Sequence, residues 1–205
     1  MGTVRKFPLW VWWVIGPAVI IGIAVGVVIA VSNPAPILPP GLVEKREAVF
    51  KLRDEAGRLT DVDIRPLVEL EAKKDYAGAV ALMDQALAAN AAYERIIGAE
   101  VALGGELALL AIQVEPDAVG AKAITAFETL TQLARAEQKF YENRRRLYEL
   151  TRSYYLGLAA GEKPPIPENL GALVNQVNAG LDQIRDLHGR FAAAIQAFDL
   201  AISGR

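Results

Sequence analysis

The sequence predicts an all-α protein, with one N-terminal transmembrane helix followed by an elongated antiparallel bundle of three long helices plus shorter N-terminal helices. Three observations support this prediction. Residues 8–31 are apolar and carry no charge. The remainder is rich in alanine and leucine, and short breaks containing proline or glycine divide it into long uninterrupted segments. The last segment repeats its apolar residues at spacings of four and three, the period of an amphipathic helix.

The segment 8–31 has the length of a membrane-spanning helix. At about 1.5 Å per residue it would extend about 36 Å, more than a hydrocarbon layer of about 30 Å. Arg5 and Lys6 lie directly before it, whereas the first charged residue after it is Glu44. Because basic flanking residues stay on the cytoplasmic side, we expect a single-pass signal anchor in the cell membrane, with the N-terminus cytoplasmic and residues 33–205 extracytoplasmic. Membrane lipid is then a partner through this segment.

A cleaved signal peptide is the alternative to an anchor. Ala30, Val31 and Ser32 resemble a small-residue cleavage site. The apolar segment is much longer than the roughly 7–15 residues that are usual in a signal peptide. The sequence therefore favours a retained anchor, and a mature N-terminus at Asn33 would show cleavage instead.

A stripe of small residues follows one face of the apolar segment. Its members lie four residues apart, at Ala18, Gly22, Gly26 and Ala30. Small residues at this spacing allow two membrane helices to approach each other closely. We therefore expect the stripe to support self-association. The alternative is a passive stripe, since glycine and alanine are frequent in membrane helices.

The chain divides into four regions. We assign residues 1–7 to a cytoplasmic leader, 8–31 to the transmembrane helix, 32–40 to a spacer and 41–205 to the extracytoplasmic helical-bundle domain. Four prolines in the spacer exclude a helix there. They predict a stiff, extended connection that holds the domain off the membrane.

Two shorter helices are expected at the start of the domain. Heptad-like spacing of apolar residues predicts a helix over 41–58. Thr60 with Asp63 three residues later has the pattern of a helix cap. This pattern predicts a short helix over 63–73.

Three long helices are expected next, with bounds of about 76–113, 117–160 and 168–203. Pro116 ends the first, and Gly104 and Gly105 weaken it locally. Gly161 and the proline-rich segment 163–167 separate the second from the third. Because the connections are short, consecutive long helices should be antiparallel.

The last long helix has the clearest apolar pattern in the chain. Spacings of four and three persist along its whole length, which predicts a coiled-coil seam. The seam positions are Leu170, Val174, Val177, Leu181, Ile184, His188, Phe191, Ile195, Phe198 and Ile202. His188 is the polar member of this seam, and a polar residue there needs a partner.

A polar layer is therefore predicted inside the bundle. The preceding long helix carries Glu137 and Arg144 in the middle of its apolar face. With antiparallel helices and turns near residues 115 and 164, five polar residues fall at a similar height: Asn90, Glu94, Glu137, Arg144 and His188. Buried ionisable groups must be paired, so we expect Glu137 to pair with Arg144, joined by His188 and Asn90. Such layers fix helix register in bundles. The alternative is a small-ligand or proton-sensing pocket.

Composition excludes several functional classes. Arg5 and Lys6 account for two of the 22 basic residues, so the rest of the chain has 20 basic and 24 acidic side chains. Nucleic-acid binding needs a basic face, and we expect no nucleic acid partner. Cysteine is absent and histidine occurs once, so thiol chemistry and histidine clusters are excluded. The sequence has no zinc-protease, nucleophile-elbow or phosphate-loop motif.

These observations predict a non-enzymatic protein without a metal or cofactor. A haem held by His188 and Met83 is disfavoured because these residues fall about two helical turns apart. The leading hypothesis is a membrane-anchored helical-bundle scaffold or protein-interaction module, with a protein partner or a second copy of the chain. The alternative is an extracytoplasmic ligand- or pH-sensing bundle with its buried polar layer around His188.

Overall fold

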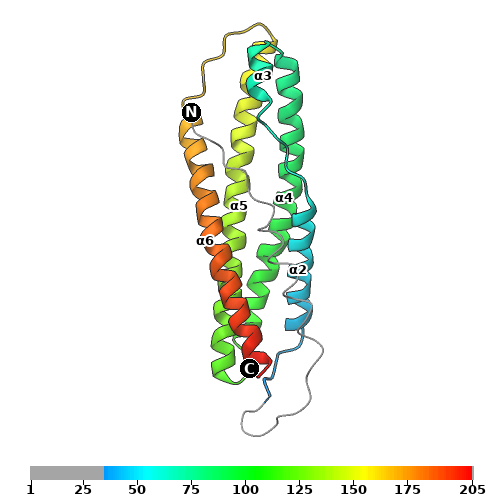
Figure 1. Cartoon of the computed structure of the whole chain (residues 1–205), viewed down its shortest axis with the longest axis vertical. Coiled ribbons are helices and arrows are strands. Elements are labelled where there is room, and N and C mark those ends of the chain that lie inside the picture. The colour runs from blue at the N-terminus through cyan, green and yellow to red at the C-terminus, as the bar shows by residue number, and fades with distance from the viewer. Residues whose placement is uncertain (1–34, 205) are drawn as a thin grey trace. The chain divides into compact units, whose positions relative to one another are not determined.

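The computed structural model describes residues 35–204, and this part of the chain is built from α-helices. They are α2 (Leu42–Arg58), α3 (Leu67–Ala72), α4 (Tyr76–Ala111), α5 (Asp117–Ala159) and α6 (Leu170–Ile202) (Figure 1). The all-α prediction and the three long helices are confirmed. Most helix ends lie within two residues of the predicted bounds, because proline and glycine set them. The chain from Pro36 onward forms one compact unit.

The predicted leader, the transmembrane helix over 8–31 and its stripe at Ala18, Gly22, Gly26 and Ala30 lie outside the described residues. Within residues 35–204, no helix has both the length and the apolar character that a membrane span requires. The anchor therefore stays a prediction from the sequence.

The long helices α4, α5 and α6 run antiparallel to one another, as the short connections predict (Figure 1). Helix α5 is central, since it packs on α4 and on α6. Helix α2 packs on α4 and reaches α6 through Arg46, whose Nη2 donates a hydrogen bond to Asp199 Oδ2 over 2.8 Å. The half of the bundle that contains the α4–α5 turn thus has four helices of alternating direction. Helix α3 packs on α4 in the other half.

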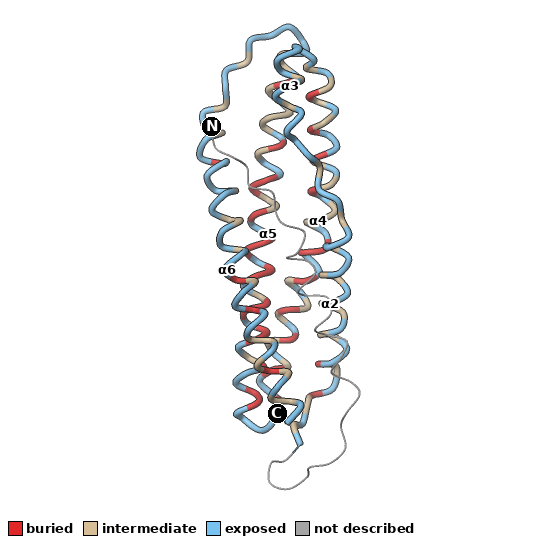
Figure 2. The backbone as a smooth tube through the Cα atoms, in the orientation of Figure 1, coloured by how far each residue is buried: buried red, intermediate tan, exposed pale blue. Residues whose placement is uncertain are grey.

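The buried residues follow α4 and α5 along their length (Figure 2). In the four-helix half, Phe127 of α5 meets Phe198 of α6 edge to face, with ring centroids 5.7 Å apart. Small residues let the helices approach elsewhere. A Cβ atom added to Gly104 would lie 3.0 Å from Thr131 Oγ1, so this glycine allows close contact between α4 and α5. The predicted weak point in the helix is therefore a packing position.

The α6 seam is only half buried over much of its length. Of the seam positions, Phe191 and Phe198 are buried and Val174 is exposed. The other buried apolar residues of α6, Leu173 and Leu187, lie beside the seam. In the half with the α4–α5 turn, α6 also contacts α2 through Asp199 with Arg46 and Phe191 with Arg53. In the other half α6 packs mainly on α5.

The short helix starts later than predicted. Helix α3 begins at Leu67, with Pro66 at the N-cap position. A proline lacks the backbone N–H that a helix interior needs, so it is accommodated only at the start of the helix. The predicted cap at Thr60 is wrong. Asp63 instead accepts hydrogen bonds from Arg65, and Asp61, itself exposed, accepts one from the buried Arg144.

Half of the predicted spacer belongs to the bundle. The Ile37 N–H donates to the Glu115 carbonyl over 2.9 Å, and the Glu115 N–H donates to the Ile37 carbonyl over 3.1 Å. Leu38 packs against the core and Pro39 is buried. Residues 36–40 are thus fixed to the α4–α5 turn, because their apolar side chains and free backbone groups find partners there.

Candidate functional site

The polar layer predicted from the sequence forms two separate clusters in the structure. The first, called here the carboxylate cluster, consists of Arg53, Glu100, Glu137 and His188, one residue from each of α2, α4, α5 and α6. The second, called here the Arg144 cage, consists of a central guanidinium with its partners Asp61 and Asn90 and four aromatic rings: Tyr93, Phe140, Tyr141 and Tyr148.

Glu137 lies at the centre of the carboxylate cluster. Its Oε1 is 3.1 Å from His188 Nε2, and its Oε2 accepts a hydrogen bond from Arg53 Nη2 over 3.4 Å. The sequence places His188 level with Glu137, and the antiparallel packing of α5 and α6 brings the two together. The His188 side chain itself is 35% exposed. It lies at the edge of the core and faces inward.

Glu100 is the most buried member of the cluster. Its side chain is 0% exposed, and its Oε1 accepts a hydrogen bond from Arg53 Nη2. Its Oε2 is buried and lacks a hydrogen-bond partner. Burial raises the pKa of Glu100 to about 7; Arg53 opposes this shift and Glu137 adds to it. A carboxyl group in this position takes up a proton near neutral pH.

Arg53, which lies on α2, links the carboxylates of Glu100 and Glu137. Its guanidinium lies over the Phe191 ring, 5.5 Å from the centroid, so it also contacts α6. A cation over an aromatic face is attracted by the electrons of the ring. Its Nε is buried without a hydrogen-bond partner. One guanidinium therefore faces two carboxylates and is not fully satisfied by either.

Arg144 has different partners from those predicted. Its Nε donates to Asn90 Oδ1 over 2.6 Å, and its Nη1 donates to Asp61 Oδ2 over 2.7 Å. The Asn90 amide donates in turn to Glu94 Oε1 and to the Tyr141 carbonyl, each over 3.0 Å. The expected pair between Glu137 and Arg144 does not form, because each is bound by groups from other helices.

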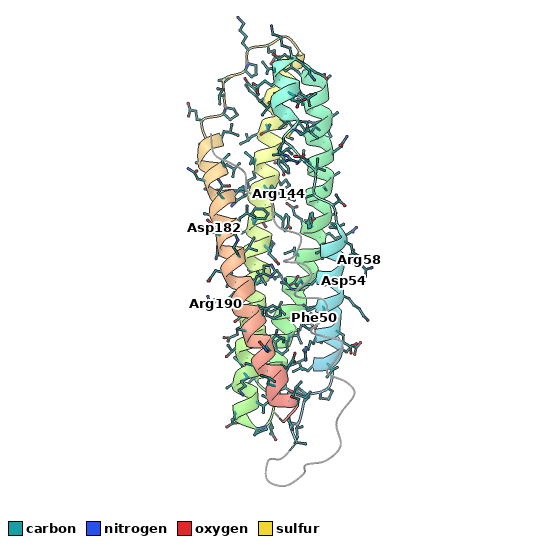
Figure 3. The ribbon with its side chains drawn as sticks, viewed as in Figure 1. Phe50, Asp54, Arg58, Arg144, Asp182 and Arg190 are labelled. Atoms are coloured by element: carbon teal, nitrogen blue, oxygen red, sulfur yellow. The ribbon has the colours of Figure 1, made fainter. Side chains whose placement is uncertain are left out.

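Arg144 lies on α5 (Figure 3), and aromatic rings surround its guanidinium. The ring centroids of Tyr93, Phe140, Tyr141 and Tyr148 lie 4.8–5.7 Å from its central carbon. Tyr93 and Tyr141 are stacked, with centroids 4.9 Å apart. Burial raises the pKa of the Tyr141 hydroxyl, and the nearby Arg144 cation opposes this shift. The Tyr141 ring therefore stays a neutral phenol.

A cage of this kind could in principle bind a ligand cation, but here the chain's own arginine occupies it. The arrangement is a self-contained structural contact. It joins α4, α5 and the segment before α3 at one height.

Three charged members of the clusters, and the four aromatic rings of the cage, were not predicted from the sequence. Arg53 and Asp61 belong to segments whose position in the bundle the sequence did not indicate. Glu100 gave a usable signal, because it shares the apolar helix face with Ile96 and Leu107. A charged residue on such a face deserves the same scrutiny as His188.

A shallow polar groove of about 440 Å³ lies between α5 and α6 on the surface. Its floor contains Ala136 and Leu187, and its rim carries Arg135, Lys139 and Arg190. The polar side chains that line it are all exposed. Since no buried polar group points into it, we assign it no ligand.

The described part of the chain contains no group of three or more His, Asp or Glu side chains arranged to hold a metal ion. Comparison of the chain with protein-family models, with curated proteins and with solved structures finds no match in any of the three. The functional interpretation therefore depends on the geometry of the two clusters.

Proposed function

We propose that the chain is a membrane-anchored, non-enzymatic helical-bundle scaffold or protein-interaction module. The observation that supports this proposal is the Arg144 cage. A binding pocket would leave its aromatic rings and polar groups open to a ligand, whereas this cage is filled by a side chain of the protein itself. A buried polar contact of this kind specifies helix register and so gives the bundle one defined surface.

The surface offers apolar positions at both ends of the bundle. Val68 on α3 is 74% exposed, and Leu109 and Ile112 near the α4–α5 turn are 67% and 68% exposed. Exposed apolar side chains contribute most when a partner removes them from water. They are the first positions to probe for a protein partner.

Site-specific photo-crosslinking in the native membrane tests this function. A crosslinking side chain is placed at Val68, Leu109 or Ile112 of the full-length chain, with the exposed charged position Asp182 on α6 as the control (Figure 3). We expect an adduct of discrete mass at one apolar position and none at the control. The absence of adducts at all three apolar positions would contradict an interaction function.

In a distinct version of this proposal, the partner is a second copy of the chain and the two copies associate through the transmembrane stripe. Crosslinking would then give an adduct of twice the chain's mass. We expect the double substitution Gly22→Ile and Gly26→Ile to abolish that adduct, because large side chains prevent close helix approach. Unchanged dimer crosslinking in this variant would show that the stripe is passive.

A second candidate function is extracytoplasmic pH sensing. It is favoured by Glu100, a fully buried carboxyl group with an unpaired oxygen beside a second carboxylate. The expected consequence is that partner crosslinking changes between about pH 5.5 and about pH 8.5, the range around the pKa of Glu100. Crosslinking yields that are equal at the two pH values would argue against sensing.

A further inference from the structure

Helix α2 is attached to the bundle by few buried apolar side chains. Only Leu42 and Val49 are buried along its length. Phe50 packs half-buried against the same core, and ion pairs provide further attachments of α2 to the long helices. They comprise Lys45 with Glu106, Arg46 with Asp199, and Arg53 with the carboxylate cluster.

The carboxylate cluster lies under α2. Arg53 reaches Glu100 of α4 and Glu137 of α5, and the ring of Phe191 lies beneath its guanidinium. If α2 moved away, Glu100 would lose both its cation and the helix that keeps water from it. The protonation of Glu100 and the position of α2 are therefore linked.

We propose that the carboxylate cluster is a one-proton site through which pH controls the attachment of α2 to the bundle. This inference rests on the sensing function proposed above and specifies its regulation. The proton comes from solvent and binds the Glu100 carboxylate; no covalent bond between heavy atoms changes.

The charges in the cluster require such a proton. Around Glu100 the facing groups are Arg53 from α2 and Glu137 from α5, and His188 from α6 faces Glu137. With both carboxylates ionised and the imidazole neutral, the cluster carries one uncompensated negative charge. Uptake of one proton makes it neutral, which is the favoured state for a buried group.

The unpaired Oε2 atom places the proton on Glu100. An ionised carboxylate with one oxygen buried and unsatisfied is more costly than a neutral carboxyl group there. His188 is partly exposed and contacts solvent in the attached state. Glu100 can be hydrated only when α2 opens, so its titration is the one coupled to that motion.

The direction of the effect follows from linkage. The attached state holds the Glu100 proton up to about pH 7, whereas a solvated glutamate releases it near 4.5. Between these values the attached state binds more protons than the open state, so rising pH favours opening. Because one pKa unit corresponds to a tenfold change, the opening equilibrium should increase by about 30-fold from about pH 5.5 to about pH 8.5.

Thiol labelling of the full-length chain in detergent micelles tests the proposal. The chain has no cysteine, so single cysteines report one position each. Val49→Cys places a thiol on the buried face of α2, and Lys51→Cys places one on its exposed face. The labelling rate at position 49 divided by that at position 51 measures α2 opening. Because thiol ionisation speeds both rates as pH rises, its effect cancels in this ratio. We expect this ratio to rise about 30-fold over the stated pH range.

Matched variants assign the effect. Glu100→Gln keeps the shape of the protonated side chain and should remove the rise, whereas His188→Gln should retain it. Ala86→Cys, buried on α4 away from α2, should show no comparable rise. A flat ratio, a rise that persists in Glu100→Gln, or an equal rise at Ala86→Cys would each overturn the proposal.

The labelling ratio measures α2 opening in the absence of any partner, whereas the crosslinking yield measures whether partner binding depends on pH. A pH-dependent ratio with constant crosslinking would support the proton site and refute sensing. Constant labelling with pH-dependent crosslinking would refute this inference and leave sensing to another group.

Discussion

At the scale of single residues, Arg144 should contribute more to the stability of the bundle than any other arginine of α5. Arg144→Ala leaves Asn90 and the surrounding rings without their central cation. We expect the free energy of unfolding to fall by about 3 kcal/mol, because the buried Asn90 oxygen loses a charged hydrogen-bond donor and the rings lose their cation–π contact. Arg146→Ala, on the exposed face of the same helix, should change it by less than about 0.5 kcal/mol.

Urea denaturation followed by circular dichroism measures both variants. Equal losses for Arg144→Ala and Arg146→Ala would mean that the cage contributes no more than an ordinary surface position. A loss confined to Arg144→Ala would show that the cage stabilises the bundle.

The carboxylate cluster predicts a pH dependence of global stability. The folded state holds the Glu100 proton up to about pH 7, and the unfolded chain releases it near pH 4.5. The contribution of this group is present below pH 4.5 and is lost as pH rises to 7. It amounts to about 3 kcal/mol at about 1.4 kcal/mol per pKa unit. Thermal or urea unfolding across this range should show the decrease, and Glu100→Gln should be flat by comparison.

Sequence reasoning located part of the site and missed part of it for identifiable reasons. The contact between His188 and Glu137 follows from antiparallel helices with known turns, so chain position alone suffices. Glu100 and Arg53 meet only because α2 packs across α4, and no periodicity in the sequence specifies which helix a short element chooses. The same holds for Asp61, which lies between Thr60 and Asp63, the two residues whose spacing suggested a helix cap.

At the scale of helices, proline and glycine explain why the predicted bounds agree with the structure. Pro116 stands at the N-cap of α5, and Gly161, with a positive φ, follows the end of the same helix. The start of α3 differs from prediction because Pro66 is accommodated only at a helix start, whereas the spacer differs because tertiary contacts decide it. The bridge of Ile37 with Glu115 is one such contact.

The adjacent glycines of α4 provide an element-scale test. A Cβ atom at Gly105 meets nothing within 4 Å, so Gly105→Ala should raise the free energy of unfolding by about 0.5–1 kcal/mol through helix propensity. At Gly104 the Cβ atom would lie 3.0 Å from Thr131 Oγ1. Gly104→Ala should therefore lose that gain and destabilise the α4–α5 contact. Chemical denaturation compares the pair, and equal stabilisation by both would show that the contact can relax.

At the scale of the whole molecule, the bundle should fold without the N-terminal segment. The compact unit begins at Pro36. A chain that starts at Pro36 should therefore have the same helical content in this unit, and the same unfolding temperature, as the full-length chain. A chain starting at Gly41 loses the Ile37 bridge, Leu38 and the buried Pro39. We expect it to be less stable by about 2 kcal/mol. Equal stability of the two truncated chains in urea denaturation would show that residues 36–40 are not part of the folded unit.

The topology predicted from the charge flanks has its own test. Protease added to intact spheroplasts should degrade residues 33–205 and leave the anchor in the membrane, since the flanks place the domain outside. Full protection of the domain would reverse the orientation. A mature N-terminus at Asn33 would show that the segment is cleaved.

The attachment of Ile37 to Glu115 also determines how the bundle responds to mechanical force. Tension applied through residue 35 acts first on the two hydrogen bonds of this bridge. Since α2 starts at the same end, continued pulling would peel it from Leu42 towards Arg58, breaking its contacts one after another rather than shearing them together. Arg46 would separate from Asp199 before Arg53 leaves the carboxylate cluster. The long helices α4, α5 and α6 would carry little load until α2 had come away.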